Sequence, residues 1–100
     1  MVTDPRLKDD FEFPDGSAVE LFGIVDEASP GRYYYRMQYY DPETGTILRY
    51  DNAHDSGTGH HHRHYRADDG TLAVEAIEFE GLEAHTERFL DEVYELYAQR

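Results

Sequence analysis

The chain has 100 residues, of which 39% are hydrophobic and 14% aromatic, so it suits one compact domain over residues 1–100 and is too short for two. Without cysteine it has no disulfide, thiolate zinc site or thiol nucleophile, and without a long apolar run or signal-peptide pattern we expect a cytoplasmic protein with no membrane contact. A net charge of −13 on a chain this rich in aromatic residues excludes a disordered acidic tail and favours the hydrated acidic surface of a halophilic, archaeal-type protein.

Short alternating and aromatic segments predict a sheet in the first half of the chain. Residues 11–13 and 17–26 flank the turn sequence Pro14-Asp15-Gly16 and predict a hairpin. The tyrosine-rich residues 32–40 predict the next strand. Alternation along this strand puts one set of side chains in the core, namely Tyr33, Tyr35, Met37 and Tyr39.

A second hairpin is predicted around a loop of residues 42–45, in which Pro42 begins the turn and Gly45 takes a left-handed conformation. The opposite face of this hairpin is then polar, and it carries Arg32, Tyr34, Arg36, Arg49 and Asp51. The register expected from this loop pairs Asp41 with Thr46, Tyr39 with Leu48, Gln38 with Arg49, Met37 with Tyr50 and Arg36 with Asp51.

The second half of the chain predicts a further strand and a helix. Residues 60–65 favour a strand, and residues 71–79 fit no single pattern. Residues 82–98 repeat apolar side chains with the helical period, and we expect His85, beside that apolar stripe, to be a packing residue. The fold class is therefore α+β, with an antiparallel sheet of four to five strands and the C-terminal helix packed on its Tyr/Met/Leu face.

Positive charge is concentrated in the middle of the chain. Residues 1–31 carry a net charge of −6 and residues 67–100 a net charge of −8, whereas residues 32–66 carry +1 and five of the six histidines. In so acidic a molecule, a segment that keeps arginine and histidine predicts a place where an anion binds. The alternative is that these arginines only balance neighbouring carboxylates.

Two neighbouring sequences carry the most specific signal: Arg-Tyr-Asp-Asn at residues 49–52, and Gly-Thr-Gly-His-His-His-Arg-His-Tyr at residues 57–65. Together they resemble the TumE family of toxin–antitoxin proteins, and the likeness extends over most of the chain. The sequence differs from the family where Ala53-His54-Asp55 replaces a common Pro-His-His. The resemblance implies a small toxin that acts on RNA or translation and is paired with a DNA-binding antitoxin of helix-turn-helix or winged-helix type.

The same residues suit cleavage of RNA without a bound metal or other cofactor. Histidine transfers protons near neutral pH and arginine stabilises a crowded phosphate, so we predict catalytic roles for His62, His64 and Arg49. Asp51 is more simply explained as an ion-pair partner of Arg36 or Arg49 than as a general base. The residues expected to bind the phosphates and an unpaired base of the substrate are Arg36, Arg63, Arg66, Tyr34, Asp51 and His54.

Other interpretations of the histidine-rich segment stay open. On a strand, His60, His62 and His64 share one face and would be the ligands of a metal, although the outer two are about 13 Å apart at Cα. The segment is also compatible with a solvated loop. In a non-enzymatic interpretation, the arginine and tyrosine face docks an acidic protein partner.

Overall fold

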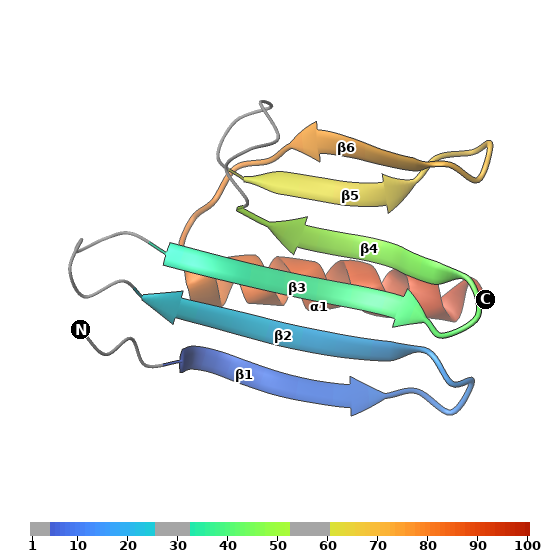
Figure 1. Cartoon of the computed structure of the whole chain (residues 1–100), viewed down its shortest axis with the longest axis horizontal. Helices are drawn as coiled ribbons and strands as arrows, with labels where there is room; N and C mark the ends of the chain where they lie inside the picture. Colours follow the sequence, from blue (N-terminus) through green and yellow to red (C-terminus); the bar gives the residue numbers. More distant parts are fainter. Residues whose placement is uncertain (1–4, 26–32, 53–60) are drawn as a thin grey trace.

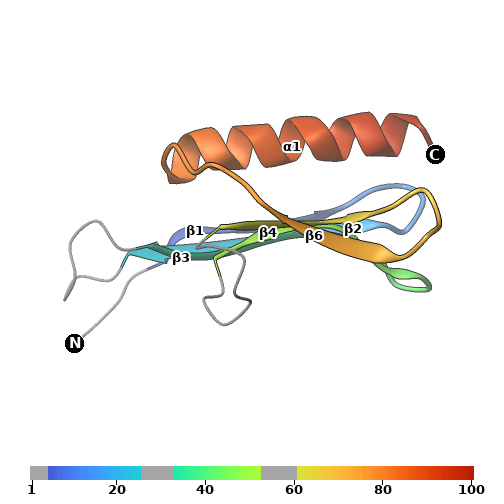
Figure 2. The same ribbon diagram turned by 90° about the horizontal axis from the view of Figure 1, so that it is seen from above.

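The structure of the chain is a computed structural model that describes residues 5–25, 33–52 and 61–100. Six antiparallel strands form one sheet in sequence order, and a helix lies across one of its faces (Figures 1 and 2). The expected α+β class is confirmed, with six strands instead of four to five. The elements are β1 (Pro5–Glu12), β2 (Ala18–Val25), β3 (Tyr33–Asp41), β4 (Gly45–Asp51), β5 (His62–Arg66), β6 (Leu72–Ala76) and α1 (Leu82–Ala98).

The hairpin predicted from residues 11–13 and 17–26 is confirmed as β1 paired with β2, and the strand beyond the expected number is β6, at the opposite edge of the sheet. β1 begins at Pro5, well before the alternating residues 11–13, and β6 lies within the ambiguous residues 71–79. Each of these strands has a single neighbour in the sheet. An edge strand tolerates charged and polar side chains, so the sequence pattern was too weak to predict the first half of β1 or to assign β6.

The predicted register of the second hairpin is correct from Arg36–Asp51 to Tyr39–Leu48 and is wrong at its tip. There Asp41 pairs with Gly45, so the loop is one residue shorter than expected, and the register shifts between Tyr39 and Tyr40. Gly45 has a φ of 88°, as the sequence indicated. This left-handed conformation lets the chain turn early, and a bulge in β4 then restores the pairing that keeps the apolar side chains on one face.

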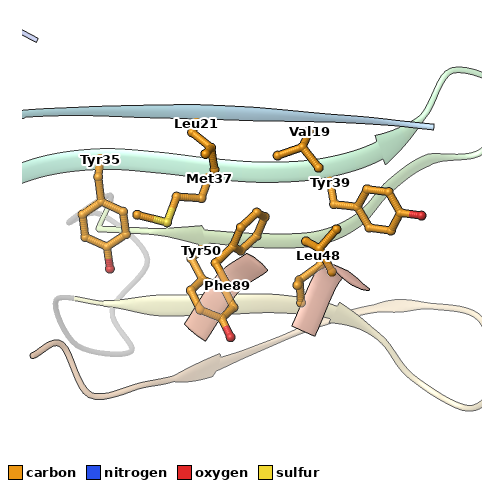
Figure 3. Packing of buried hydrophobic residues seen from close by; sticks show 9 residues of the cluster. Val19, Leu21, Tyr35, Met37, Tyr39, Leu48, Tyr50 and Phe89 are labelled. Carbon is orange, nitrogen blue, oxygen red and sulfur yellow. The ribbon is translucent and has the colours of Figure 1, made fainter. Parts of the chain in front are cut away.

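The core lies between the sheet and α1, on the Tyr/Met/Leu face as expected. Phe89 and Val93 of the helix are fully buried against the strands, and Figure 3 shows the ring of Phe89 beside that of Tyr50. α1 has the predicted bounds, and the acidic side chains along its outer side are exposed, namely Glu83, Glu87, Asp91 and Glu95. The buried apolar residues of the core are Val19, Leu21, Tyr35, Met37, Tyr39, Leu48, Tyr50, Phe89 and Val93.

Gly23 in β2 allows the start of α1 to approach the sheet closely. A Cβ atom placed on Gly23 would lie 2.9 Å from a methyl carbon of Leu82, the first residue of the helix. This is well inside the optimal separation of two carbon atoms, about 3.5–4.0 Å. The side chain of Leu82 would therefore have to move to make room for a larger residue at this position.

The face of the sheet opposite α1 is not covered by any helix or strand of the described residues, as Figure 2 shows. We call it the open face. Side chains alternate along each strand, so every second residue of β1 to β6 lies on it, except where the bulge in β4 interrupts the alternation. Within the part of the chain that the structure describes, no helix has the length and apolar character needed to cross a lipid bilayer.

Candidate functional site

β4 and β5 place four side chains of the two sequence motifs side by side. Tyr50 is fully buried on the helix side, so its neighbours Arg49 and Asp51 lie on the open face. In β5, His64 is paired with Arg49 and His62 with Asp51. Paired residues of antiparallel strands project to the same face of the sheet. We call this group of Arg49, Asp51, His62 and His64 the Asp51 cluster.

The carboxylate of Asp51 is the centre of this cluster. Its side chain is only 4% exposed, and its Oδ2 lies 2.7 Å from Nε of Arg49. His62 Nδ1 lies 3.4 Å from Oδ1, and His64 Nε2 lies 3.5 Å from Oδ2. A carboxylate buried this deeply requires positive or hydrogen-bonding groups around it. Of the two ion-pair partners expected for Asp51, the structure shows Arg49.

The members of the cluster differ in how much of each side chain reaches solvent. The side chain of His62 is fully buried, that of His64 is 26% exposed and that of Arg49 is 35% exposed. The three residues predicted to be catalytic are thus brought together around Asp51. In this structure only His64 and Arg49 present atoms that a bound molecule can reach.

Arg36 and Tyr34 share the open face with the cluster. Arg36 is paired with Asp51 across the strands, yet the ion pairs of Asp51 go to other residues, and no described carboxylate forms an ion pair with Arg36. The Tyr34 side chain is 53% exposed. Arg36 and Tyr34, two of the residues predicted to bind the substrate, are therefore exposed beside the cluster.

The two remaining described arginines of the predicted substrate-binding set are engaged elsewhere. Arg63 points to the helix side, where its guanidinium forms ion pairs with Glu92 and Glu75. Arg66 donates hydrogen bonds to the carbonyl oxygens of Thr44, Thr46 and Gly70, and so joins two turns of the sheet. The structure thus does not bring Arg63 to the open face, because its position in β5 alternates with those of the histidines.

Several predicted residues lie outside the described part of the chain. These are Arg32 of the polar face, His54 of the substrate-binding set and His60 of the alternative metal site. Among the described residues, no group of three or more His, Asp or Glu side chains has the arrangement of a metal site.

Arg63 belongs to a polar network between β5 and α1. Its guanidinium binds the Glu92 carboxylate, which also accepts a hydrogen bond from the hydroxyl of Tyr50. Burial favours a raised pKa for Glu92, but the hydrogen bonds from Arg63 and Tyr50 outweigh it and lower the pKa. Burial, together with the hydrogen bond to Glu92, raises the pKa of Tyr50. This closed network explains why the helix face tolerates an arginine.

A second polar group on the helix side was not predicted as a unit. The hydroxyl of Tyr35 lies 2.9 Å from Nδ1 of His61 and 2.9 Å from Nε2 of His85, so it can donate to one ring and accept from the other. His61 stacks on Phe79 with ring centroids 4.5 Å apart. Burial, with the nearby charges of His61 and Arg88, lowers the pKa of His85 to about 4. His85 is thus the packing residue that its place in the apolar stripe indicated.

The open face is divided by charge. On β3, β4 and β5 the alternation places three arginines and one carboxylate there, which are Arg36, Arg49, Arg66 and Asp51. The neighbouring β1 and β2 place three acids and one lysine on the same face, which are Asp10, Glu12, Glu20 and Lys8. A basic area around the cluster therefore adjoins an acidic one, within a chain whose net charge is −13. Among the described residues of the open face, the cationic side chains are thus concentrated around the cluster, which favours this area for an anion.

Comparison with known families gives an independent result. The chain matches the family described as Toxin TumE over residues 2–97. No curated protein and no solved structure matches it. The family match includes the whole sheet, the Asp51 cluster and nearly all of α1. Because it spans almost the entire sequence, the chain belongs to the TumE toxin family.

Proposed function

We propose that this TumE-family toxin cleaves RNA in the cytoplasm and is neutralised by a DNA-binding antitoxin, as in type II toxin–antitoxin pairs. The observation that carries the proposal is the Asp51 cluster, in which a buried carboxylate holds an arginine and a partly exposed histidine on the basic area of the open face. An imidazole and a guanidinium beside one another are the groups that metal-free RNA cleavage requires.

His64 is the proton-transfer residue in this proposal. Its Nε2 lies 3.5 Å from Oδ2 of Asp51, so the carboxylate is placed to orient the ring, much as a carboxylate orients the histidine of a hydrolase triad. The other ring nitrogen, Nδ1, is then the atom that accepts the proton of the ribose 2′-hydroxyl. The 2′-oxygen forms a bond to phosphorus, the bond from phosphorus to the 5′-oxygen breaks, and His64 returns the proton to that leaving oxygen.

Arg49 and His62 have different roles around the same carboxylate. Arg49 uses Nε toward Asp51, so its two terminal nitrogens remain to stabilise negative charge on the phosphate. His62, being fully buried, acts as a positioning residue that holds Asp51 from the side away from His64. In this proposal the two sequence motifs thus supply an orienting carboxylate, a histidine that carries the proton, an arginine that binds the phosphate and a buried histidine that positions the carboxylate.

The toxic activity is tested by expressing the protein and its variants in cells. We expect growth arrest by the wild type and its loss in His64→Ala, Asp51→Asn and Arg49→Lys. Matched controls are Asp91→Asn and Arg88→Lys, which change exposed side chains of α1 and should remain toxic. Full toxicity of His64→Ala, with the protein present at the wild-type level, would contradict the role of His64.

The chemistry is tested with purified protein and RNA in molar salt. We expect products with 2′,3′-cyclic phosphate or 3′-phosphate ends, and a cleavage rate that falls roughly 100- to 10,000-fold in His64→Ala. Activity should persist with a chelator present. Cleavage that requires a divalent ion and leaves 3′-hydroxyl ends would instead show that a metal activates the nucleophile.

The antitoxin part of the proposal has its own test. Co-expression with the product of the adjacent gene should abolish growth arrest and yield a complex that copurifies with the toxin. That partner should bind the DNA upstream of the gene pair. An adjacent gene product that neither binds the toxin nor restores growth would contradict the pairing.

A further inference from the structure

Tyr34 and Arg36 form an exposed pair directly beside the Asp51 cluster. They are alternate residues of β3, so they lie on the same face with Cα atoms about 6.6 Å apart. Arg36 is exposed and is the cross-strand partner of Asp51. An aromatic ring and a guanidinium are thus presented on the side of Asp51, the carboxylate at the centre of the proposed site.

Among the described residues, packing of the core does not require an aromatic side chain at position 34. Its neighbours on β3, Tyr35 and Tyr39, are 1% and 0% exposed and fill the core, whereas Tyr34 is 53% exposed. None of the described aromatic contacts involves the ring of Tyr34. A large apolar ring left on an open sheet face is a common feature of surfaces that bind other molecules.

Charge identifies the kind of molecule that fits this pair. Arg36 has no carboxylate partner among the described residues. It lies within the basic area that β3, β4 and β5 form on the open face. The rest of the molecule is strongly acidic. A polyanion is therefore attracted to this area and repelled by its surroundings, whereas an acidic protein surface offers no flat base for an aromatic ring to stack on.

We propose that Tyr34 and Arg36 form a nucleotide subsite that selects single-stranded RNA, with the base stacked on the Tyr34 ring and the phosphate bound by Arg36. This deepens the proposed function and rests on RNA being the target. A base reaches an aromatic ring on a flat sheet only when it is unpaired and turned away from its neighbours. The bases of a duplex are stacked inside it, so the subsite discriminates against paired RNA.

Binding is the appropriate measurement, because it does not depend on cleavage. The probe is a fluorescently labelled single-stranded RNA with 2′-O-methyl groups, which lacks the hydroxyl nucleophile, and its affinity is compared with that of the same strand in a duplex. We expect the single strand to bind more tightly. Tyr34→Ala should weaken its binding roughly 5- to 100-fold, the range of one lost stacking contact, while Tyr34→Phe stays within about twofold of the wild type.

Two controls make the result specific to this place on the surface. Tyr94 on α1 is 51% exposed, so Tyr94→Ala removes an equally exposed ring from the other side of the molecule. Arg88→Ala likewise controls for Arg36→Ala. Neither control should change binding, whereas Arg36→Ala should weaken it and reduce its salt dependence.

Failure of the subsite can be told apart from failure of the proposed function. Equal affinity for single-stranded and duplex RNA, or unchanged binding by Tyr34→Ala, overturns the subsite even if the wild type cleaves RNA. Selective binding that Tyr34→Ala abolishes supports the subsite even if no cleavage occurs. If the wild type binds neither RNA but Tyr34→Ala loses the antitoxin, the pair is a protein-docking surface and the subsite is overturned.

Discussion

The two faces of the sheet differ in whether their polar side chains bond only to one another or also reach solvent. On the helix face, His61 and His85 both form hydrogen bonds with the hydroxyl of Tyr35, and Tyr50 and Arg63 both bind Glu92. On the open face, Asp51 is buried but the groups around it extend to solvent through His64 and Arg49. Polar groups that bond only to one another stabilise the fold, whereas groups that keep free donors at the surface are available to a substrate.

This contrast explains why histidine and arginine content alone does not locate the site. Residues 61–66 supply both faces, because alternate side chains of β5 point in opposite directions. His62 and His64 go to the open face, and Arg63 goes to α1. Adjacent residues of one motif therefore have unrelated roles, and substitutions should separate loss of stability from loss of activity.

The largest expected effect is on the helix face. Phe89→Ala should lower the free energy of unfolding by about 3–5 kcal/mol, since it removes a fully buried ring that packs edge-on against Tyr50. Chemical denaturation at high salt measures this loss. A loss below about 1 kcal/mol would mean that α1 contributes little to the core and would break the contrast between the faces.

The next largest effect on the free energy of unfolding depends on pH and comes from His85. Its pKa is about 4 in the folded protein and about 6.5 when unfolded, so the unfolded chain binds the proton more readily. Stability from this residue is therefore complete above pH 6.5 and falls as the pH drops toward 4, by about 2 kcal/mol at pH 5. Unfolding of the wild type and of His85→Phe at pH 7 and pH 5 measures it. Equal losses in both proteins would contradict the assignment.

A smaller effect is expected from the network of Tyr50. Tyr50→Phe keeps the ring packing and removes only the hydroxyl that donates to Glu92, so it should cost about 1.5 kcal/mol. A double-mutant cycle with Glu92→Gln tests whether the cost comes from this contact. RNA cleavage should be unchanged in Tyr50→Phe when the protein is folded. A large loss of cleavage would assign the helix face a part in the chemistry.

The smallest effect on stability is expected on the open face. Tyr34→Ala and Arg36→Ala change exposed side chains, so the free energy of unfolding should stay within about 0.5 kcal/mol of the wild type. Denaturation beside the RNA-binding assay gives both values for each variant. A substantial destabilisation of either variant would show that its residue stabilises the fold, as the polar residues of the helix face do.

Much of the fold followed from local sequence patterns. The bounds of α1, the core side of β3 and the pairing of Arg36 with Asp51 are all confirmed. Each depends on a strong period of apolar side chains or on a turn sequence, which act over a few residues. The first half of β1, the edge strand β6 and the exact tip of the second hairpin lack such a pattern, and only the completed sheet defines them.

By itself, the sequence determined which residue types meet near the site: arginine, aspartate and histidine from two motifs, held in neighbouring strands by the alternation of core residues. Only the tertiary structure decided what each one contacts. Pairing of β4 with β5 placed Asp51 between Arg49, His62 and His64, and packing of α1 drew Arg63 to Glu92. Burial and distance between segments far apart in the chain are properties of the packed molecule, so no local pattern contains them.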